Sequence, residues 1–472
     1  MAPPYPHPRP RARILQFGGG NFLRGFLDWK VEGMNRAAGT DWGIIVLRSL
    51  GGVADSALNA QDGLYTVLAR GLGADGQPVS DVRVVGAVLR EISCQTDWPR
   101  VLELAANPEI EVVVSNTTES GIAHDPGADP ADAPPASFPA KLAVLLHHRW
   151  QAGAPGWQVI PCELTDKAGD LLAGLVRRHA ADWGWPQAFL DWLGRACSFH
   201  NTLVDRIVPG RPRGDLAAIE SRLGYADPCL ITTEPFHFLA IEQRPDQPPI
   251  RLPLADFDDG TLVTPDVTPW KLRKVALLNG AHTALCPLAL IAGIPTVGAA
   301  MGDPAGRAFL VRLMQEEIKP FLNLPGPDLD RFAAEVLNRF ANPFIAHAWH
   351  DISLNAVSKI RQRNLDRMAA YHARHGAPAP LFSLSLAAWL VFYLGRFPGA
   401  AQLPPRDTPE TLARIAALQP LQGLALVRAW LGDTTLWGRS LDLPDLRATV
   451  LHHVEALSER PFRLADWPGL LT

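Results

Sequence analysis

Three side chains that could act together on a hydroxyl or carbonyl group lie close in the sequence, at Lys274, Asn279 and His282. At about 100° per residue, a continuous α-helix over 271–290 would point them to about 0°, 140° and 80°, on one face. A lysine with a lowered pKa could take the hydroxyl proton as hydride leaves the carbon. The asparagine amide could stabilise an alkoxide-like oxygen, and a neutral imidazole could hold the substrate. The spacing indicates alcohol–ketone redox chemistry, although it also fits a solvated lysine, a core histidine and a helix irregularity.

Lysine is scarce in this chain, which strengthens the interpretation that a given lysine has a specific role. Of the 44 basic residues only seven are Lys, and the other 37 are Arg. Arginine has therefore replaced lysine wherever a generic cation suffices. A retained lysine is expected at a position that arginine could not fill, chiefly one where the side chain must release a proton near neutral pH.

A glycine-rich turn at 17–25 follows a short apolar stretch and precedes a helical pattern. This order is that of a dinucleotide-binding βαβ unit, in which Gly18 would allow the tight turn and Gly20 the close approach of a pyrophosphate. Leu23 replaces the usual third glycine, and the spacing alone also fits a tight surface turn. The residues expected to bind the dinucleotide here are Phe17, Gly18, Gly19, Gly20, Asn21, Phe22, Leu23, Arg24 and Gly25.

The end of the second expected strand lacks the acid that usually holds the adenosine ribose and selects NAD. Arg48 and Ser49 stand there instead, and Arg48 could face a 2′-phosphate or stack on adenine. Asp41 precedes the strand and is badly placed for the ribose. This position therefore leaves both NAD and NADP open.

The hydrophobic pattern predicts an α/β protein, with an N-terminal Rossmann-type, doubly wound sheet domain followed by an all-helical C-terminal domain. The expected boundaries are a disordered leader over 1–12, a dinucleotide-binding domain over 13–260 and a helical substrate and catalytic domain over 261–472. The first domain is expected to hold strands over 13–17, 43–47, 82–88, 110–115 and 157–161, helices over 21–38 and 141–150, and a loop over 121–139. Helices are expected in the second domain over 271–290, 305–322, 329–340, 408–418 and 441–457.

Composition excludes several classes of protein. The 472 residues are 47% apolar and 19% charged with a net charge of −4, which argues against a disordered chain and a basic nucleic-acid-binding protein. The five scattered cysteines suggest neither a disulfide framework nor a zinc motif, and no metal is expected. The apolar stretches at 284–301 and 381–394 are too rich in Pro and Gly, or too short, for a membrane span. We therefore expect a soluble, cytoplasmic protein with no nucleic-acid or membrane partner.

Motifs along the whole chain resemble one family. They are FGGGNFLRGF at 17–26, QDGLYTV at 61–67, SNTTESGI at 115–122, PCE at 161–163, LVDRIVPG at 203–210, KVALLNGAHTAL at 274–285 and RFANPFI at 339–345. Their content and order resemble the polyol-specific long-chain dehydrogenases, the mannitol dehydrogenase family. The K-x4-N-x2-H motif at 274–282 is specific to that family.

This resemblance implies an active site in the cleft between the two domains and a metal-independent, nicotinamide-dependent reaction. It implies Lys274 as general acid/base, Asn279 as an oxyanion-type donor and His282 as a substrate ligand. The resemblance also implies that Asp205, Arg206 and Lys359 bind the substrate. It implies that Asn116 and Thr117 belong to a segment that lies under the cofactor.

Two departures from the polyol-oxidising relatives indicate a particular branch. Leu164 stands where those relatives carry a second oxyanion-hole asparagine, and Asp351 stands where they carry an arginine. Both departures fit the altronate oxidoreductases (tagaturonate reductases), which are regarded as NAD-dependent although their Arg48 position is basic. The resemblance therefore implies NADH-dependent, reversible reduction of tagaturonate, a keto-hexuronate, to altronate.

A sugar-acid substrate requires cations for its carboxylate, and Lys359, Arg206, Arg361 and Lys141 are candidates, although the last three also fit surface cations or structural ion pairs. Two enzymatic alternatives share the scaffold, a fructuronate reductase (mannonate oxidoreductase) and a mannitol-type polyol dehydrogenase. A dinucleotide-sensing protein without activity is a third alternative. The complete Lys-Asn-His set argues against the sensor, which would have no need of an acid/base lysine.

Overall fold

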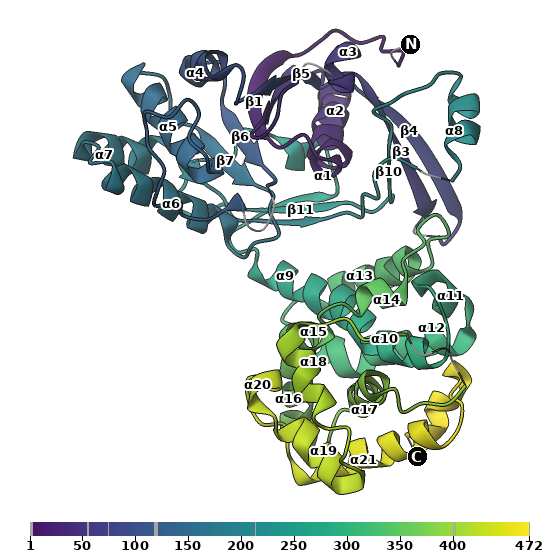
Figure 1. Cartoon of the computed structure of the whole chain (residues 1–472). Coiled ribbons are helices and arrows are strands. Elements are labelled where there is room, and N and C mark those ends of the chain that lie inside the picture. Colours follow the sequence, from purple (N-terminus) through teal and green to yellow (C-terminus); the bar gives the residue numbers. More distant parts are fainter. Residues whose placement is uncertain are drawn as a thin grey trace. The chain divides into compact units, whose positions relative to one another are not determined.

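The computed structural model describes residues 3–53, 56–73, 75–117, 121–212, 214–399, 401 and 403–471 (Figure 1). The chain divides into two compact units. Residues 1–70 and 78–267 form one, here called the sheet unit, and residues 71–77 and 268–472 form the other, the helical unit. The boundary at 267/268 lies a few residues beyond the expected 260/261. The short segment 71–77 belongs with the helical unit, in which Asn338 Nδ2 donates to Gly73 O at 2.9 Å.

The sheet unit is built on six parallel strands in the order β5-β2-β1-β6-β7-β8. Their bounds are β1 Arg11–Phe17, β2 Trp42–Arg48, β5 Val88–Ser93, β6 Val112–Ser115, β7 Gln158–Pro161 and β8 Ser198–Phe199. Counted along the chain within this sheet, the order is 3-2-1-4-5-6, that of a doubly wound dinucleotide-binding fold. The prediction of a Rossmann-type sheet is confirmed.

Both faces of this sheet are covered, which explains why its strands are apolar on both sides. Leu15 and Phe17 of β1 pack in one core with helices α4 to α7, whereas Ile14 packs in a second core with α1 and α2. The helices are α1 Asn21–Gly25, α2 Leu27–Ala38, α3 Ala57–Ala60, α4 Trp98–Ala106, α5 Phe138–Gln151, α6 Ala168–Asp182, α7 Gln187–Ala196 and α8 Leu216–Leu223.

Two three-stranded sheets accompany the large one, and the hydrophobic pattern did not predict them. Their orders are β10-β3-β4 and β12-β11-β9. The strands are β3 Tyr65–Leu72, β4 Pro78–Val85, β9 Thr202–Asp205, β10 Ile231–Thr233, β11 Phe238–Glu242 and β12 Thr261–Thr264. Most of these strands are only three to five residues long, too short to give a clear alternation.

The helical unit is all-helical in its described part after Thr268, apart from one isolated bridge between Thr296 and Ala348. Its helices are α9 Thr268–Lys274, α10 Ala281–Ile291, α11 Val297–Gly302, α12 Pro304–Arg312, α13 Gly326–Phe340, α14 Trp349–Ile352, α15 Ala356–Arg363, α16 Leu365–His375, α17 Pro380–Leu394, α18 Pro409–Ala416, α19 Gly423–Gly432, α20 Thr434–Trp437 and α21 Pro444–Glu459. Two π-helical turns, Val275–Gly280 and Leu313–Ile318, interrupt helices that the pattern predicts as continuous.

The longest apolar helical stretch lies in the core of this unit. Thr268–Ile291 spans 24 residues and is long and apolar enough to cross a membrane, but 83% of its most apolar window is buried inside the protein. Its apolar side chains are therefore accounted for by packing within the unit.

Three expectations about the first hundred residues are corrected. The expected disordered leader packs on the sheet unit: Tyr5 Oη donates to Glu32 Oε2 at 3.3 Å, and Arg9 Nη2 donates to Val88 O at 2.7 Å. The single helix expected over 21–38 breaks at Phe26, whose φ of −128° and ψ of −81° are not helical. The strand expected over 82–88 is the end of β4 and the start of β5, separated at Gly86, whose N–H donates to Glu32 Oε2 at 2.9 Å.

Candidate functional site

A cavity of about 1000 Å³ in the sheet unit opens at the carboxyl ends of the central strands. The strand order reverses between β1 and β6, and open α/β sheets bind ligands at such a switch point. Seven residues expected to bind the dinucleotide line this cavity: Gly18, Gly19, Gly20, Arg24, Arg48, Asn116 and Thr117.

The other expected residues of the turn do not line the cavity. Phe17 is fully buried, with its ring 4.8 Å from that of Phe138, and Leu23 and Gly25 are buried in α1. Asn21 and Phe22 lie on α1 outside the lining. The expected residues that do reach the cavity are therefore the glycines, Arg24 and the ends of β2 and β6.

The glycines of the turn fit a dinucleotide. Gly18 has a φ of +112°, and a Cβ there would lie 2.8 Å from the carbonyl oxygen of Asn116. A Cβ at Gly19 would lie 2.6 Å from Glu91 Oε1. Gly20 has nothing within 4 Å of its Cβ position, so its backbone is open to a pyrophosphate in the cavity.

Arg48 faces an acid that sequence reasoning missed. Glu91 on the neighbouring strand β5 lines the same cavity, is 7% exposed, and places Oε2 3.9 Å from Arg48 Nη1. Ser56 Oγ donates to the same oxygen at 2.6 Å, and Asn59 exchanges hydrogen bonds with the Glu91 backbone. The cavity thus contains an acid on β5, whereas none stands at the end of β2. The sequence gave little signal for it, because Glu91 follows the exposed Arg90 in a short strand with no clear alternation.

The PCE motif positions the segment under the cofactor site. Glu163 accepts hydrogen bonds from Thr117 N at 3.0 Å and Ser115 Oγ at 3.1 Å, and Asn116 Nδ2 donates to Cys162 O at 2.6 Å. Burial raises the pKa of Glu163, and these hydrogen bonds oppose the rise. Glu163 therefore acts as the brace that holds Asn116 and Thr117 at the cavity.

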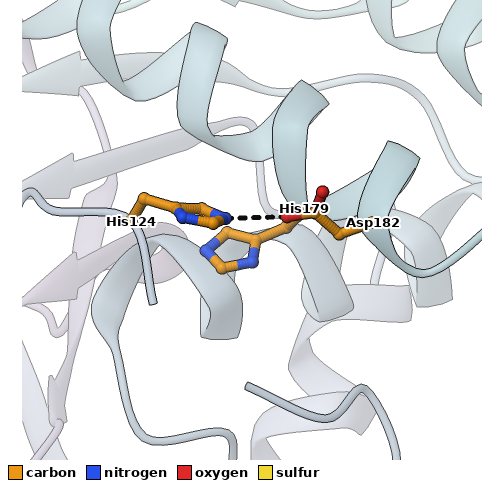
Figure 2. A group of neighbouring side chains, drawn as sticks. All are labelled: His124, His179 and Asp182. Carbon is orange, nitrogen blue, oxygen red and sulfur yellow. Dashed lines mark hydrogen bonds and ion pairs between the residues drawn. The ribbon is translucent and has the colours of Figure 1, made fainter. Parts of the chain in front are cut away.

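A cluster of two histidines and an aspartate lies beside the cavity, which His124 lines (Figure 2). His124, which lines the cavity, places Nε2 2.7 Å from Asp182 Oδ2 at the end of α6. The ring of His179 lies 4.8 Å from that of His124, and its buried Nε2 has no hydrogen-bond partner among the described residues. Burial lowers the pKa of His179. The three ligand-type atoms lie within 4.8 Å of one another, and they would have to approach further to share a zinc ion, whose ligands lie about 2.0–2.2 Å from the metal.

The expected substrate residues of the sheet unit are buried. Arg206 is 5% exposed, donates from Nη1 to Gly25 O at 2.8 Å and stacks on Trp29 at 4.1 Å. Burial lowers its pKa to about 9. Asp205, at the end of β9, is also buried. Lys141 is fully buried and donates to Ala136 O at 2.6 Å, beneath the wall of the dinucleotide cavity.

The Lys-Asn-His helix of the helical unit is not a continuous α-helix. Lys274 ends α9, Asn279 lies in the π-helical turn Val275–Gly280, and His282 lies in the first turn of α10. A π-helical turn has i→i+5 hydrogen bonds, so residues five apart lie roughly one above the other. The turn therefore brings Asn279 nearer to the line of Lys274 than the expected angle of about 140°.

His282 lies in a buried aromatic pocket. It stacks on Phe340 with ring centroids 3.8 Å apart, and the rings of His347 and Trp349 meet it edge-on at 5.4 and 5.9 Å. Burial holds its pKa well below the ordinary value, and His347 and Arg363 lower it further. These surroundings therefore favour the neutral imidazole. The buried Nε2 atom of His282 and Nε1 atom of Trp349 have no hydrogen-bond partner among the described residues, and both suit a polar ligand.

Helix α15 lies against this pocket. Arg363 Nη1 donates to Thr283 Oγ1 at 3.1 Å and to Asn279 O at 3.4 Å, and Lys359 Nζ donates to Ile352 O at 2.8 Å. The helical unit thus brings together Asn279, His282 and Lys359 as expected, and adds Arg363, which the sequence did not single out.

Comparisons with known proteins agree with this arrangement. Residues 12–251 match a family described as the mannitol dehydrogenase Rossmann domain, and residues 266–458 match the mannitol dehydrogenase C-terminal domain. The chain is 43% identical to an altronate oxidoreductase of Klebsiella pneumoniae strain 342, over 97% of this chain and 96% of the relative. It is 41% identical to an altronate oxidoreductase of Escherichia coli O7:K1, over the same shares of the two chains.

Two solved structures share the fold. A substrate-free D-sorbitol dehydrogenase aligns with a TM-score of 0.77 at 22% identity, over 100% of this chain and 96% of that one. Mannitol 2-dehydrogenase of Pseudomonas fluorescens, solved with NAD and D-mannitol, aligns with a TM-score of 0.70 at 24% identity, over 98% and 94%.

Proposed function

Because the chain belongs to the mannitol dehydrogenase family, we propose that it reduces tagaturonate to altronate with NADH, reversibly. The observation that carries this proposal is its identity of 41–45% to altronate oxidoreductases, which extends over nearly the whole chain in most of them. The complete Lys274, Asn279 and His282 set supports a catalytic role over a sensor role. The reaction belongs in the cytoplasm, where NADH and sugar acids meet.

In the proposed reaction, bound nicotinamide supplies the hydride to the carbonyl carbon, or accepts it in reverse. The ammonium of Lys274 gives its proton to the carbonyl oxygen as that oxygen gains electrons, and takes it back from the hydroxyl in the oxidation. The side-chain amide of Asn279 donates to the same oxygen. The neutral His282 ring orients the substrate through Nε2, which is buried and open to a hydroxyl.

NAD is proposed over NADP because of Glu91. Its carboxylate lies in the dinucleotide cavity beside Arg48 and Gly19. A carboxylate at this place accepts hydrogen bonds from ribose hydroxyls and repels a 2′-phosphate, and it also balances the positive charge of Arg48.

The assay that tests the proposal measures NADH oxidation by the purified protein with tagaturonate, fructuronate and fructose, and identifies the product. We expect kcat/KM to be highest for tagaturonate and the product to be altronate. Mannonate as the main product, from fructuronate, would make the protein a fructuronate reductase. A preference for fructose would make it a polyol dehydrogenase, and no turnover with any of the three would favour a sensor.

A further inference from the structure

Two cations share one face of α15 beside the reactive turn. Lys359 and Arg363 are four residues apart, so their side chains lie on the same side of the helix. Arg363 is fixed next to Asn279 by its hydrogen bonds to Asn279 O and Thr283 Oγ1. Both cations also lie near the ring of His282, whose pKa they lower.

The described residues give this pair no ion-pair partner, although the charge of Asp407 acts on Lys359 and raises its pKa. Among the residues that the structure describes, no carboxylate lies within 4.0 Å of either side chain. Burial lowers the pKa of Arg363 to about 10, and burial followed by repulsion from Arg363 lowers the pKa of Lys359. Like charges four residues apart on a helix are unfavourable, and half-burial strengthens the repulsion. A bound anion would reduce both the repulsion between the two cations and the cost of burying their charges.

Arg363 also keeps one edge of its guanidinium open. Both of its hydrogen bonds in the described part of the chain come from Nη1, so Nε and Nη2 have no protein partner there. This edge presents two parallel N–H groups, the geometry that binds a carboxylate in a bidentate manner. Arg149 shows the contrast, because carbonyl oxygens of Pro155, Ala105, Asn107 and Ile110 occupy its Nε, Nη1 and Nη2.

We infer that Arg363, together with Lys359, forms the subsite that binds the carboxylate of a sugar-acid substrate. This inference rests on the proposed function and assigns the part of the site that separates a keto-uronate from a neutral ketose. The substrate carbonyl would lie at Asn279 and the carboxylate at α15. The hydroxyls between them would have the unpartnered atoms of His282 and Trp349 as partners.

Arg361 provides a matched control on the same helix. It is exposed, and it lines a separate cavity of about 310 Å³ together with Asp407 and Glu410. At about 100° per residue, it points away from the face that carries Lys359 and Arg363. Its sequence-based candidacy as a carboxylate ligand is therefore not supported by its placement.

The test compares kcat/KM with NADH for tagaturonate and for the neutral ketose tagatose in the wild type, Arg363→Gln, Arg363→Lys and Arg361→Gln. We expect Arg363→Gln to lower kcat/KM for tagaturonate by roughly 10- to 100-fold, mainly through KM, and to change the value for tagatose by less than about threefold. Arg363→Lys should lose less kcat/KM for tagaturonate than Arg363→Gln, because it keeps the positive charge but lacks the two parallel N–H groups of the guanidinium. Arg361→Gln should behave as the wild type.

Equal losses on both ketoses in Arg363→Gln, or no loss on tagaturonate, would overturn the inference. If Arg363→Gln fails to fold, Arg363→Lys is the deciding variant. The inference requires it to lower kcat/KM for tagaturonate more than kcat/KM for tagatose. NADH affinity and the melting temperature show that each variant is intact. A wild type that prefers tagatose would instead refute the proposed function.

Discussion

Lys274 is the residue on which the proposed chemistry depends, because a proton must leave and return at its side chain. It is half-buried at the end of α9, immediately before the π-helical turn. Two other lysines of this arginine-rich protein are buried in the sheet unit. Lys30 is 1% exposed and binds Asp258 and His237 in a space that suits a compact ammonium, and Lys141 is fully buried.

Replacing Lys274 by Ala should abolish turnover while leaving NADH binding intact. Loss of a general acid/base costs about 10²- to 10⁴-fold in rate. Lys274→Arg should be nearly as damaging, because a guanidinium does not give up its proton at working pH. The measurements are kcat by NADH oxidation and NADH affinity by fluorescence. Activity above a tenth of the wild type in either variant would move the acid/base role to another residue.

Glu91→Gln should raise the use of NADPH relative to NADH. The variant keeps acceptors for Ser56 and for a ribose, but removes the negative charge beside Arg48. We expect the ratio of kcat/KM for NADPH to that for NADH to rise roughly tenfold, which corresponds to about 1.4 kcal/mol. Glu103→Gln, an exposed carboxylate paired with Arg100 on α4, is the control for net charge. An unchanged ratio in Glu91→Gln would exclude Glu91 from cofactor choice.

At the scale of elements, the two π-helical turns place groups that a regular helix would place differently. The turn at 275–280 brings Asn279 nearer to the line of Lys274 than a regular α-helix would. The turn at 313–318 carries Glu317, which accepts hydrogen bonds from Leu381 N at 2.6 Å and Phe382 N at 2.9 Å at the start of α17. Glu317 thus caps the buried central helix of the unit from another element.

Because Glu317 is buried at this cap, the stability of the protein should depend on pH. Burial raises the pKa of Glu317 to about 7, against 4.5 for an ordinary glutamate. Between these values the folded protein binds more protons at this site than the unfolded chain, so its contribution to stability falls as pH rises through about 7. Glu317→Gln keeps an acceptor and cannot titrate. The melting temperature of the wild type relative to Glu317→Gln should therefore be lower at pH 8 than at pH 5, and an equal or opposite difference would contradict the assigned pKa.

At the scale of the whole molecule, the Rossmann-type sheet and the helical second half could be predicted from the sequence, but several elements of the site could not. The central strands are long apolar runs between turn residues, and these can be recognised locally. The π-helical turn at 275–280 cannot, because an apolar run has the same composition whether its hydrogen bonds span four residues or five. Glu91 and Arg363 were missed because each meets its partner through a neighbouring strand or helix far away in the chain.

The burial of the lysines has a practical consequence for chemical labelling. All seven lysines lie in the described ranges, and only Lys167, at the start of α6, is exposed, while the others are half-buried or buried. Among the lysines, an amine-reactive dye or a surface-coupling ester would therefore attach mainly at Lys167. Of the lysines, Lys167 would provide the main link between the protein and a support coupled in this way.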